Sequence, residues 1–224
     1  MKVLAIDTTT NVLTVSVCED KKPLAEYFID HKRTHSQKLM PVIETLLSDT
    51  GIDISEIDLF AVSVGPGSFT GIRIGLTAAR TLAQACQKKV APVNTLKGLA
   101  YNASFTGGRV CATIDARNGN LYAAVYSFRG GRCKTVLEPC FISAEELNLY
   151  LSSKRGKTIV VGETALVKGD KILQLEPRLD IPKASSVAAA AIDDGIFLDY
   201  NDADACYISK PQAQRELEEK EKKK

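Results

Sequence analysis

The first residues that could do chemistry are Asp7-Thr8-Thr9-Thr10, which follow a short apolar run. A carboxylate can hold a magnesium ion, and nearby hydroxyl and amide groups can donate hydrogen bonds to phosphate oxygens. Asp7, Thr8 and Thr9 are therefore candidate nucleotide-binding residues. Asp and Thr also favour ordinary turns, because their side chains bond their own backbone. A plain hairpin turn is the alternative interpretation.

A second candidate is a glycine-rich loop, Gly65-Pro66-Gly67-Ser68-Phe69-Thr70-Gly71, between an expected strand and an expected helix. Its glycine spacing differs from that of dinucleotide-binding loops, and no acidic residue follows at the usual distance. No Lys-Ser or Lys-Thr pair follows the last glycine, which excludes a Walker loop. The free amides of a helix N-terminus could still hold an anion. We favour a tight structural turn.

The sequence gives little support to metal chemistry. His31 and His35 have a spacing that could bind zinc, but Lys32 and Arg33 lie between them and would repel a metal ion. We expect a structural or interface role for both histidines. The absence of an H-E-x-x-H motif disfavours a metallopeptidase. In an ATPase of this kind, the turn Asp115-Ala116-Arg117-Asn118-Gly119 would carry the second phosphate loop, and Arg117 fits a tight phosphate cradle poorly. Outside the Asp7 turn, the sequence therefore indicates no catalytic residue and no metal site.

The elements that would position these residues form a repeat. Apolar runs and alternation predict three strands, a helix and a strand at residues 3–6, 12–18, 24–29, 36–48 and 59–64. The same order recurs at residues 110–115, 121–128, 135–142, a helix after Ser143, and 158–161. Glu146 completes a capping-box spacing with Ser143. We expect Pro41 to make the first turn of the first helix irregular, because proline lacks the amide donor.

Two such units, each with a sheet face to cover, should pack together. The predicted fold class is α/β, with two tandem actin-like (ASKHA, ribonuclease H-like) lobes. We place the N-terminal lobe at residues 1–105 and the C-terminal lobe at residues 106–224. Further elements are expected at residues 70–87, 90–93, 96–103 and 185–196, and the charged tail at 214–224 is expected to be a solvated or frayed helix.

The helix expected at residues 70–87 has a wide apolar face. Its apolar and small residues cover an arc of about 200°, twice the usual core-facing stripe. Gly71, Gly75, Ala79 and Ala83 recur every four residues, so a second helix could approach closely. The helix at residues 36–48 is similarly broad. Either both faces are buried inside their own lobe, or a partner protein covers part of them.

Composition narrows the function classes. The chain has 224 residues, 45% hydrophobic and 25% charged, with a formal net charge of +2. Its basic residues are scattered among acidic ones, so no concentrated patch predicts tight RNA binding by this chain alone. The six cysteines form no C-x-x-C pair and are expected to be reduced. Without a secretory leader or an apolar stretch of about 20 residues, we expect a cytoplasmic protein with no membrane contact.

Several segments together resemble the TsaB (YeaZ) family, bacterial accessory subunits for making threonylcarbamoyladenosine in tRNA. The resemblance rests on the order and spacing of Val3-Leu4-Ala5-Ile6-Asp7-Thr8-Thr9, His35-Ser36-Gln37-x-Leu39-x-Pro41-x-Ile43, Val62-Ser63-x-Gly65 through Gly75, Ile114-Asp115-Ala116-Arg117 and Tyr207-Ile208-x-Lys210-Pro211-Gln212-Ala213-Gln214. It runs nearly end to end and is most specific from Gly65 to Gly75. Lys210 stands where many members have arginine.

The resemblance implies an actin-like fold and a non-catalytic role. The chain would pair with the homologous subunit TsaD, which carries the metal and the active site, and would act with the ATPase TsaE. Together they would transfer a threonylcarbamoyl group to the adenosine beside the tRNA anticodon. ATP and metal would lie on the partner subunits, so this chain would need no cofactor, and it would meet tRNA only indirectly. The first two helices would form the docking face, used for a homodimer when TsaD is absent.

The partner-interface residues expected on these helices are His35, Leu39, Ile43, Phe69, Ile72, Arg73, Gly75, Leu76, Ala79 and Arg80. The alternative, from the enzyme class, is an actin-like ATPase or small-molecule kinase that uses Asp7. Binding of magnesium-ATP separates the two hypotheses.

Overall fold

The first sheet begins as a meander of three antiparallel strands, β1 (Lys2–Asp7), β2 (Val12–Glu19) and β3 (Lys22–Asp30). β4 (Leu59–Ser63) and β5 (Lys89–Val93) join the other side of β1 in parallel, which gives the order β3-β2-β1-β4-β5. The structure is a computed structural model, and it describes residues 1–30, 34–176 and 179–208.

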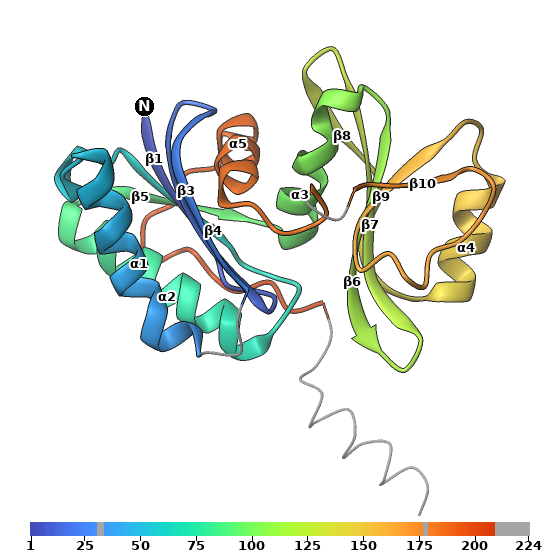
Figure 1. Ribbon diagram of the computed structural model, residues 1–224, viewed down its shortest axis with the longest axis horizontal. Coiled ribbons are helices and arrows are strands. Elements are labelled where there is room, and N and C mark those ends of the chain that lie inside the picture. The colour runs from blue at the N-terminus through green and yellow to red at the C-terminus, as the bar shows by residue number, and fades with distance from the viewer. Residues whose placement is uncertain (31–33, 177–178, 209–224) are drawn as a thin grey trace, which may run out of the picture.

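The second sheet repeats this topology (Figure 1). Its meander is β6 (Arg109–Arg117), β7 (Asn120–Arg129) and β8 (Arg132–Ser143), and β9 (Thr158–Gly162) and β10 (Ile172–Gln174) join β6 in parallel order. The predicted repeat and the α/β fold of two actin-like lobes are confirmed. The three-residue strand β10 was not predicted, because it is too short to show a period.

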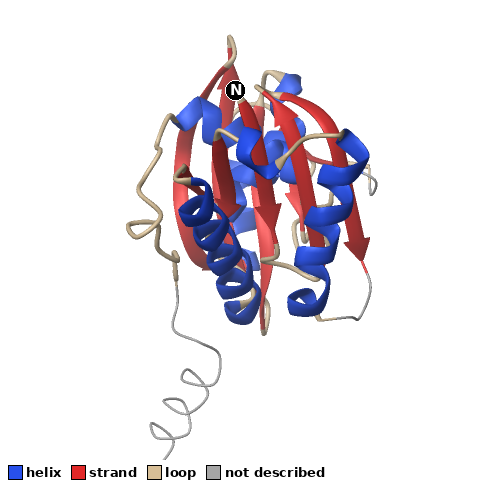
Figure 2. Cartoon of the chain, turned by 90° about the vertical axis from the view of Figure 1, so that its left-hand side faces the viewer, coloured by secondary structure: helices blue, strands red, loops and turns tan. Residues whose placement is uncertain are grey.

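Helices cover both faces of the first sheet. α1 (His35–Thr50) and α2 (Phe69–Cys86) lie side by side over one face, as Figure 2 shows. α3 (Thr95–Ala100) and α5 (Ala184–Asp194) pack against each other between the two sheets. Both faces of β1 are therefore buried, with Val3 and Ala5 in the core on the α5 side and Leu4 and Ile6 in the core under α1 and α2.

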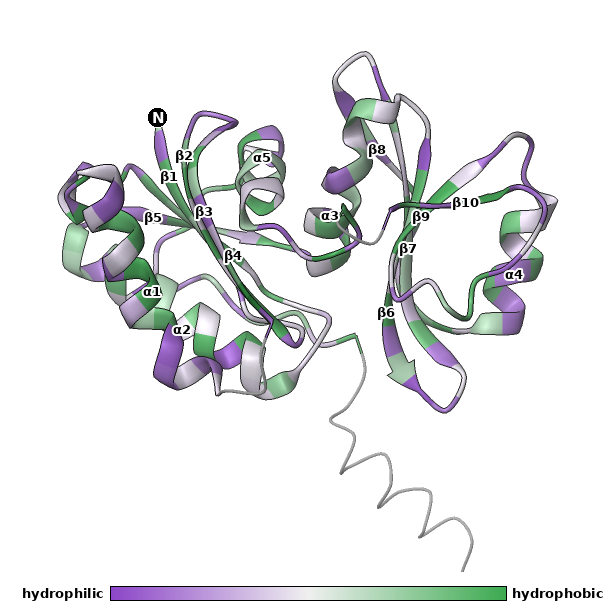
Figure 3. Cartoon of the chain, in the orientation of Figure 1, coloured by the Kyte–Doolittle hydropathy of each residue, from purple (hydrophilic) through white to green (hydrophobic). Residues whose placement is uncertain are grey.

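The second sheet has one further helix of its own, α4 (Ala144–Ser153), which covers the outer face. The expected capping box is present: the Ser143 hydroxyl accepts from the Glu146 amide at 3.2 Å, and the Glu146 carboxylate accepts from the Ser143 amide at 3.2 Å. Hydrophobic residues follow the strands of both sheets, and hydrophilic ones gather in the turns (Figure 3). Among the described residues, no helix is long and apolar enough to cross a membrane.

Two local expectations differ from the structure. α1 is continuous from His35 to Thr50, with Pro41 inside it on the exposed side and Leu39, Val42 and Ile43 still packed in the core. The C-terminal segment, assigned above to the second lobe, returns to the first sheet: α5 packs on β1 and β2, and Leu198 pairs with Val90. α1 and α2 cover one face of the first sheet, and α5 covers the opposite face. The expected tail helix at residues 214–224 lies outside the described residues.

Candidate functional site

The Asp7 turn is closed by hydrogen bonds from its own neighbourhood. One carboxylate oxygen of Asp7 accepts from the Thr9 amide at 2.8 Å and from the Thr9 hydroxyl at 2.7 Å, and the other accepts from the Ser63 hydroxyl at 2.6 Å. Asp7, Thr8 and Thr9 are each at most 2% exposed. Burial raises the pKa of Asp7 above its ordinary value. The plain-turn interpretation therefore describes this segment.

The glycine-rich loop covers this turn. The Ser68 amide donates to the Thr9 carbonyl at 2.7 Å, and the Thr8 hydroxyl donates to the Gly71 carbonyl at 2.7 Å. A Cβ atom at Gly67 would lie 2.4 Å from the Thr9 carbonyl oxygen, and one at Gly71 would lie 2.0 Å from the Thr8 carbonyl oxygen. The close approach of the loop backbone to the Thr8 and Thr9 backbone therefore requires glycine at positions 67 and 71. This agrees with the favoured reading of the loop as a tight turn.

The small-residue stripe of α2 packs against strands. A Cβ atom at Gly75 would lie 2.5 Å from the Thr8 hydroxyl and 3.5 Å from a methyl group of Val62. Ala79 and Ala83 are fully buried in the core shared with β1 and β4. The expectation that this stripe admits a second helix is therefore corrected: the small side chains let α2 approach its own sheet.

The ten residues expected at a partner interface divide by burial. Six are buried in this chain's own lobe, which corrects their expected role as direct contacts: Leu39, Ile43, Ile72, Gly75, Leu76 and Ala79. The other four retain exposed surface: His35, Phe69, Arg73 and Arg80. Helical periodicity shows which residues are apolar but not which of them the sheet covers. The sequence therefore could not separate the six buried residues from the four exposed ones.

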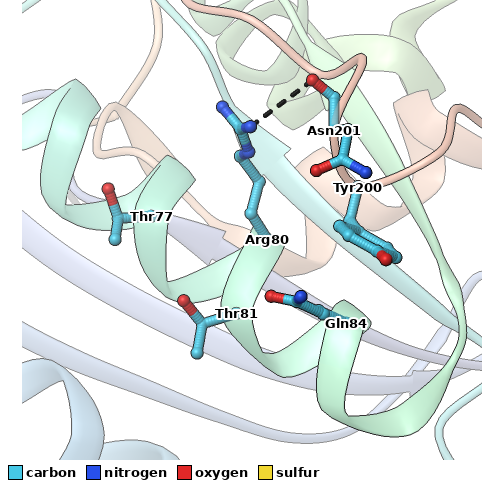
Figure 4. Close-up of a pocket in the computed structure, with 6 residues that line it drawn as sticks. All are labelled: Thr77, Arg80, Thr81, Gln84, Tyr200 and Asn201. Atoms are coloured by element: carbon cyan, nitrogen blue, oxygen red, sulfur yellow. Dashed lines mark hydrogen bonds between the residues drawn. The ribbon is translucent and has the colours of Figure 1, made fainter.

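The accessible side of α2 carries polar side chains along a shallow groove. A hollow of about 190 Å³ is lined by Thr77, Arg80, Thr81 and Gln84 of the helix and by Tyr200 and Asn201 of the C-terminal segment (Figure 4). A second hollow of about 460 Å³ continues it past Arg73 to Tyr207. Arg80 donates to the Asn201 carbonyl at 3.4 Å and lies 3.9 Å from the Asp204 carboxylate.

The C-terminal segment forms the far wall of this groove, which the sequence did not reveal. The Cys206 amide donates to the Val64 carbonyl at 2.7 Å. The rings of Tyr207 and Phe69 stack with centroids 5.0 Å apart, and the Arg73 guanidinium lies 4.0 Å from the Phe69 centroid. The tail motif beginning at Tyr207 was noticed, but its contact with α2 joins residues far apart in sequence.

The other candidates are dispersed. His35 donates from Nε2 to the Thr10 carbonyl at 2.8 Å, a structural contact, and His31 lies outside the described residues. Asp115 accepts from the Arg117 amide at 2.8 Å in an exposed hairpin turn. Within residues 1–30, 34–176 and 179–208, no group of three or more His, Cys, Asp or Glu side chains is arranged to hold a metal ion.

Known proteins with similar sequences agree with this architecture. The family model for "TsaD: tRNA N6-adenosine threonylcarbamoyltransferase" matches residues 24–222. The TsaB protein of Escherichia coli (strain K12) is 33% identical over 170 residues, 72% of this chain and 71% of that protein. TsaB of Bacillus subtilis (strain 168) is 34% identical over 137 residues, 61% of this chain and 60% of that protein, so the match spans less than two thirds of the B. subtilis relative. Both carry the name tRNA threonylcarbamoyladenosine biosynthesis protein.

A solved structure extends the likeness to nearly the whole chain. YeaZ from Pseudomonas aeruginosa is similar with a TM-score of 0.80 and 26% identity, covering 92% of this chain and 99% of that one. Two sheets of one topology, with helices between and around them, define a two-lobed, actin-like α/β protein. Within that class, the chain belongs to the TsaB (YeaZ) family.

Proposed function

We propose that this chain is a non-catalytic subunit in the biosynthesis of threonylcarbamoyladenosine in tRNA. It pairs with a TsaD-like catalytic subunit, works together with a TsaE-like ATPase, and is required for transfer of the threonylcarbamoyl group to the adenosine next to the anticodon. Membership in the TsaB family supports the pathway. ATP and metal belong to the partner subunits, and the complex works in the cytoplasm.

The observation that carries the non-catalytic role is the closed Asp7 turn. An actin-like ATPase or kinase needs a carboxylate that faces the metal and free donors that face the phosphates. Here both Asp7 oxygens already accept hydrogen bonds, and the loop from Gly65 to Gly71 covers the turn. A phosphate group at this position would have to displace backbone as well as side chains.

The docking face proposed for the partner is the accessible side of α1 and α2. Met40 is 47% exposed on α1, and Arg73 and Thr77 are exposed on α2. Phe69, Arg73 and Tyr207 form a stacked group at one end of this face. Aromatic and arginine side chains are frequent anchors of protein interfaces. In the absence of the TsaD-like subunit, the same face pairs two copies of this chain.

Reconstitution tests this proposal. A mixture of TsaD-like and TsaE-like subunits, tRNA, ATP and the threonylcarbamoyl adenylate should form the modified nucleoside only when this chain is added. The chain alone should form none. Full modification without the chain, or modification by the chain alone, would contradict the proposal. Calorimetric titration with magnesium-ATP tests the kinase alternative, which requires micromolar binding that Asp7→Ala abolishes.

A further inference from the structure

One end of the second sheet gathers basic side chains from four separate segments. The register pairs Arg109 with Thr158 of β9 and with Ser127 of β7, and it pairs Arg129 with Arg132 across the β7–β8 turn. The loop from α4 to β9 and the start of β10 reach the same end, because β10 is parallel to β9. We call this set the basic edge: Arg109, Arg129, Arg132, Lys134, Lys154, Arg155, Lys157 and Lys171.

The basic edge is not neutralised by its own chain. Among the residues that the structure describes, none of its eight members forms an ion pair with a carboxylate. The nearest acidic residue in sequence is Asp170, beside Lys171. Six members are exposed, and Arg109 and Lys154 are partly exposed. A positive field at this edge is therefore open to an external anion.

The first lobe provides an internal comparison, because its equivalent end has balanced charge. Lys2 pairs with Glu56, Lys88 lies 3.8 Å from Asp58, and the N-terminal amine lies 3.1 Å from Asp20. The equivalent turn, between β2 and β3, carries Glu19 and Asp20 beside Lys21 and Lys22. The same topology thus carries mixed charge in one lobe and nearly uniform positive charge in the other.

Hydrogen bonds to backbone carbonyls and to one hydroxyl group hold part of the basic edge in place. Lys171 donates to the carbonyls of Ser152 at 3.0 Å and Lys154 at 3.1 Å, and Arg109 donates to the Thr158 hydroxyl at 2.9 Å. The five strands span about 20 Å, from four gaps of about 4.8 Å each. Duplex nucleic acid carries roughly one charge per 1.7 Å of axis, so an edge of this length can face several phosphates.

We propose that the basic edge binds the sugar–phosphate backbone of RNA. That this RNA is the tRNA substrate rests on the proposed function. The edge lies at the top of the right-hand lobe in Figure 1, and α1 and α2 lie on the far side of the other lobe, so the docking face stays free. A membrane-binding surface would combine cations with exposed apolar anchors, and residues 129–134 and 154–157 expose no large hydrophobic side chain.

This inference revises the expectation that tRNA is met only indirectly. The sequence divides the eight cations among four short groups between residues 109 and 171, with acidic residues between the groups, so no single group forms a concentrated patch. The sheet register brings them to one edge. A net charge of +2 therefore conceals a local concentration of charge.

Fluorescence anisotropy of the full chain with a labelled tRNA transcript, at several salt concentrations, tests the proposal. The variants Arg129→Ser/Arg132→Ser and Arg155→Ser/Lys157→Ser each remove two exposed cations. The matched control, Lys21→Ser/Lys22→Ser, removes two from the equivalent turn of the first lobe. Each basic-edge variant should weaken binding by about 10- to 100-fold near 0.1 M salt and reduce the slope of log K against log salt by about 2, while the control should match the wild type.

Equal binding by all four proteins would overturn the proposal, and so would binding to phosphatidylserine vesicles without binding to RNA. The reconstituted reaction separates this test from that of the proposed function. If modification requires the chain but the basic-edge variants bind RNA normally, only the RNA proposal fails. If the variants lose RNA binding but modification never requires the chain, the RNA proposal stands and the proposed function fails.

Discussion

The Asp7 carboxylate accepts a hydrogen bond of 2.6 Å from the hydroxyl of Ser63, at the end of the neighbouring parallel strand β4. This bond engages a buried side chain that could otherwise hold a metal ion. The Thr9 amide and hydroxyl occupy its other oxygen. The turn therefore contributes to the stability of the first lobe, and the following predictions depend on this assignment.

Asp7→Ala should destabilise the chain without changing its affinity for nucleotide. The substitution leaves the Ser63 and Thr9 hydroxyls buried without their acceptor, which costs about 1–3 kcal/mol. Urea unfolding measures the loss of free energy. Asp115→Ala, at the equivalent but exposed turn of the second lobe, is the control and should change stability much less. Micromolar magnesium-ATP binding by the wild type that disappears in Asp7→Ala would contradict the assignment.

Gly75→Ala should also destabilise the monomer, because the added methyl group would lie 2.5 Å from the Thr8 hydroxyl. Overpacking of this kind typically costs about 1–3 kcal/mol. Thr77→Ala, two residues along on the exposed side of α2, is the matched control and should stay within about 0.5 kcal/mol of the wild type. Thermal unfolding of both variants measures the difference. Unchanged stability of Gly75→Ala would mean that this face of α2 is not core.

Asp180 should make the stability of the chain depend on pH. Burial raises the pKa of Asp180 to about 6, and its carboxylate accepts from the Gly162 amide. The Asp180 carboxyl ionises at a lower pH in the unfolded chain than in the folded chain. The folded chain therefore becomes less stable as pH rises from about 4 to about 6. Asp180→Asn should reduce that fall in stability, because an amide does not ionise. Its oxygen can still accept the hydrogen bond from the Gly162 amide.

Urea unfolding at several pH values between 4 and 7 measures this effect. Asp170→Asn, an exposed carboxyl in the loop before β10, removes the same charge and should keep the wild-type slope. If Asp180→Asn showed the wild-type slope as well, the raised pKa would not be a property of the folded chain.

The sequence predicted the repeat well, because each strand alternates or is uniformly apolar and each repeat keeps the same order. It predicted the closed turn only as an alternative. The residues Asp7-Thr8-Thr9 are the same whether the Asp7 carboxylate bonds Thr9 and Ser63 or the turn holds a nucleotide. The return of α5 to the first sheet and the basic edge depend on contacts between distant segments. Local patterns contain no information about such contacts.

Size-exclusion chromatography with the TsaD-like subunit tests the central claim most directly. The wild-type chain should elute with that subunit as one complex, and the double variant Arg73→Glu/Thr77→Glu, on the exposed side of α2, should elute separately while keeping its wild-type circular dichroism. Lys22→Glu, in the β2–β3 turn, is the charge-reversal control and should still form the complex. A double variant that binds as well as the wild type would contradict docking through this face, and a wild-type chain that never joins the TsaD-like subunit would contradict the account as a whole.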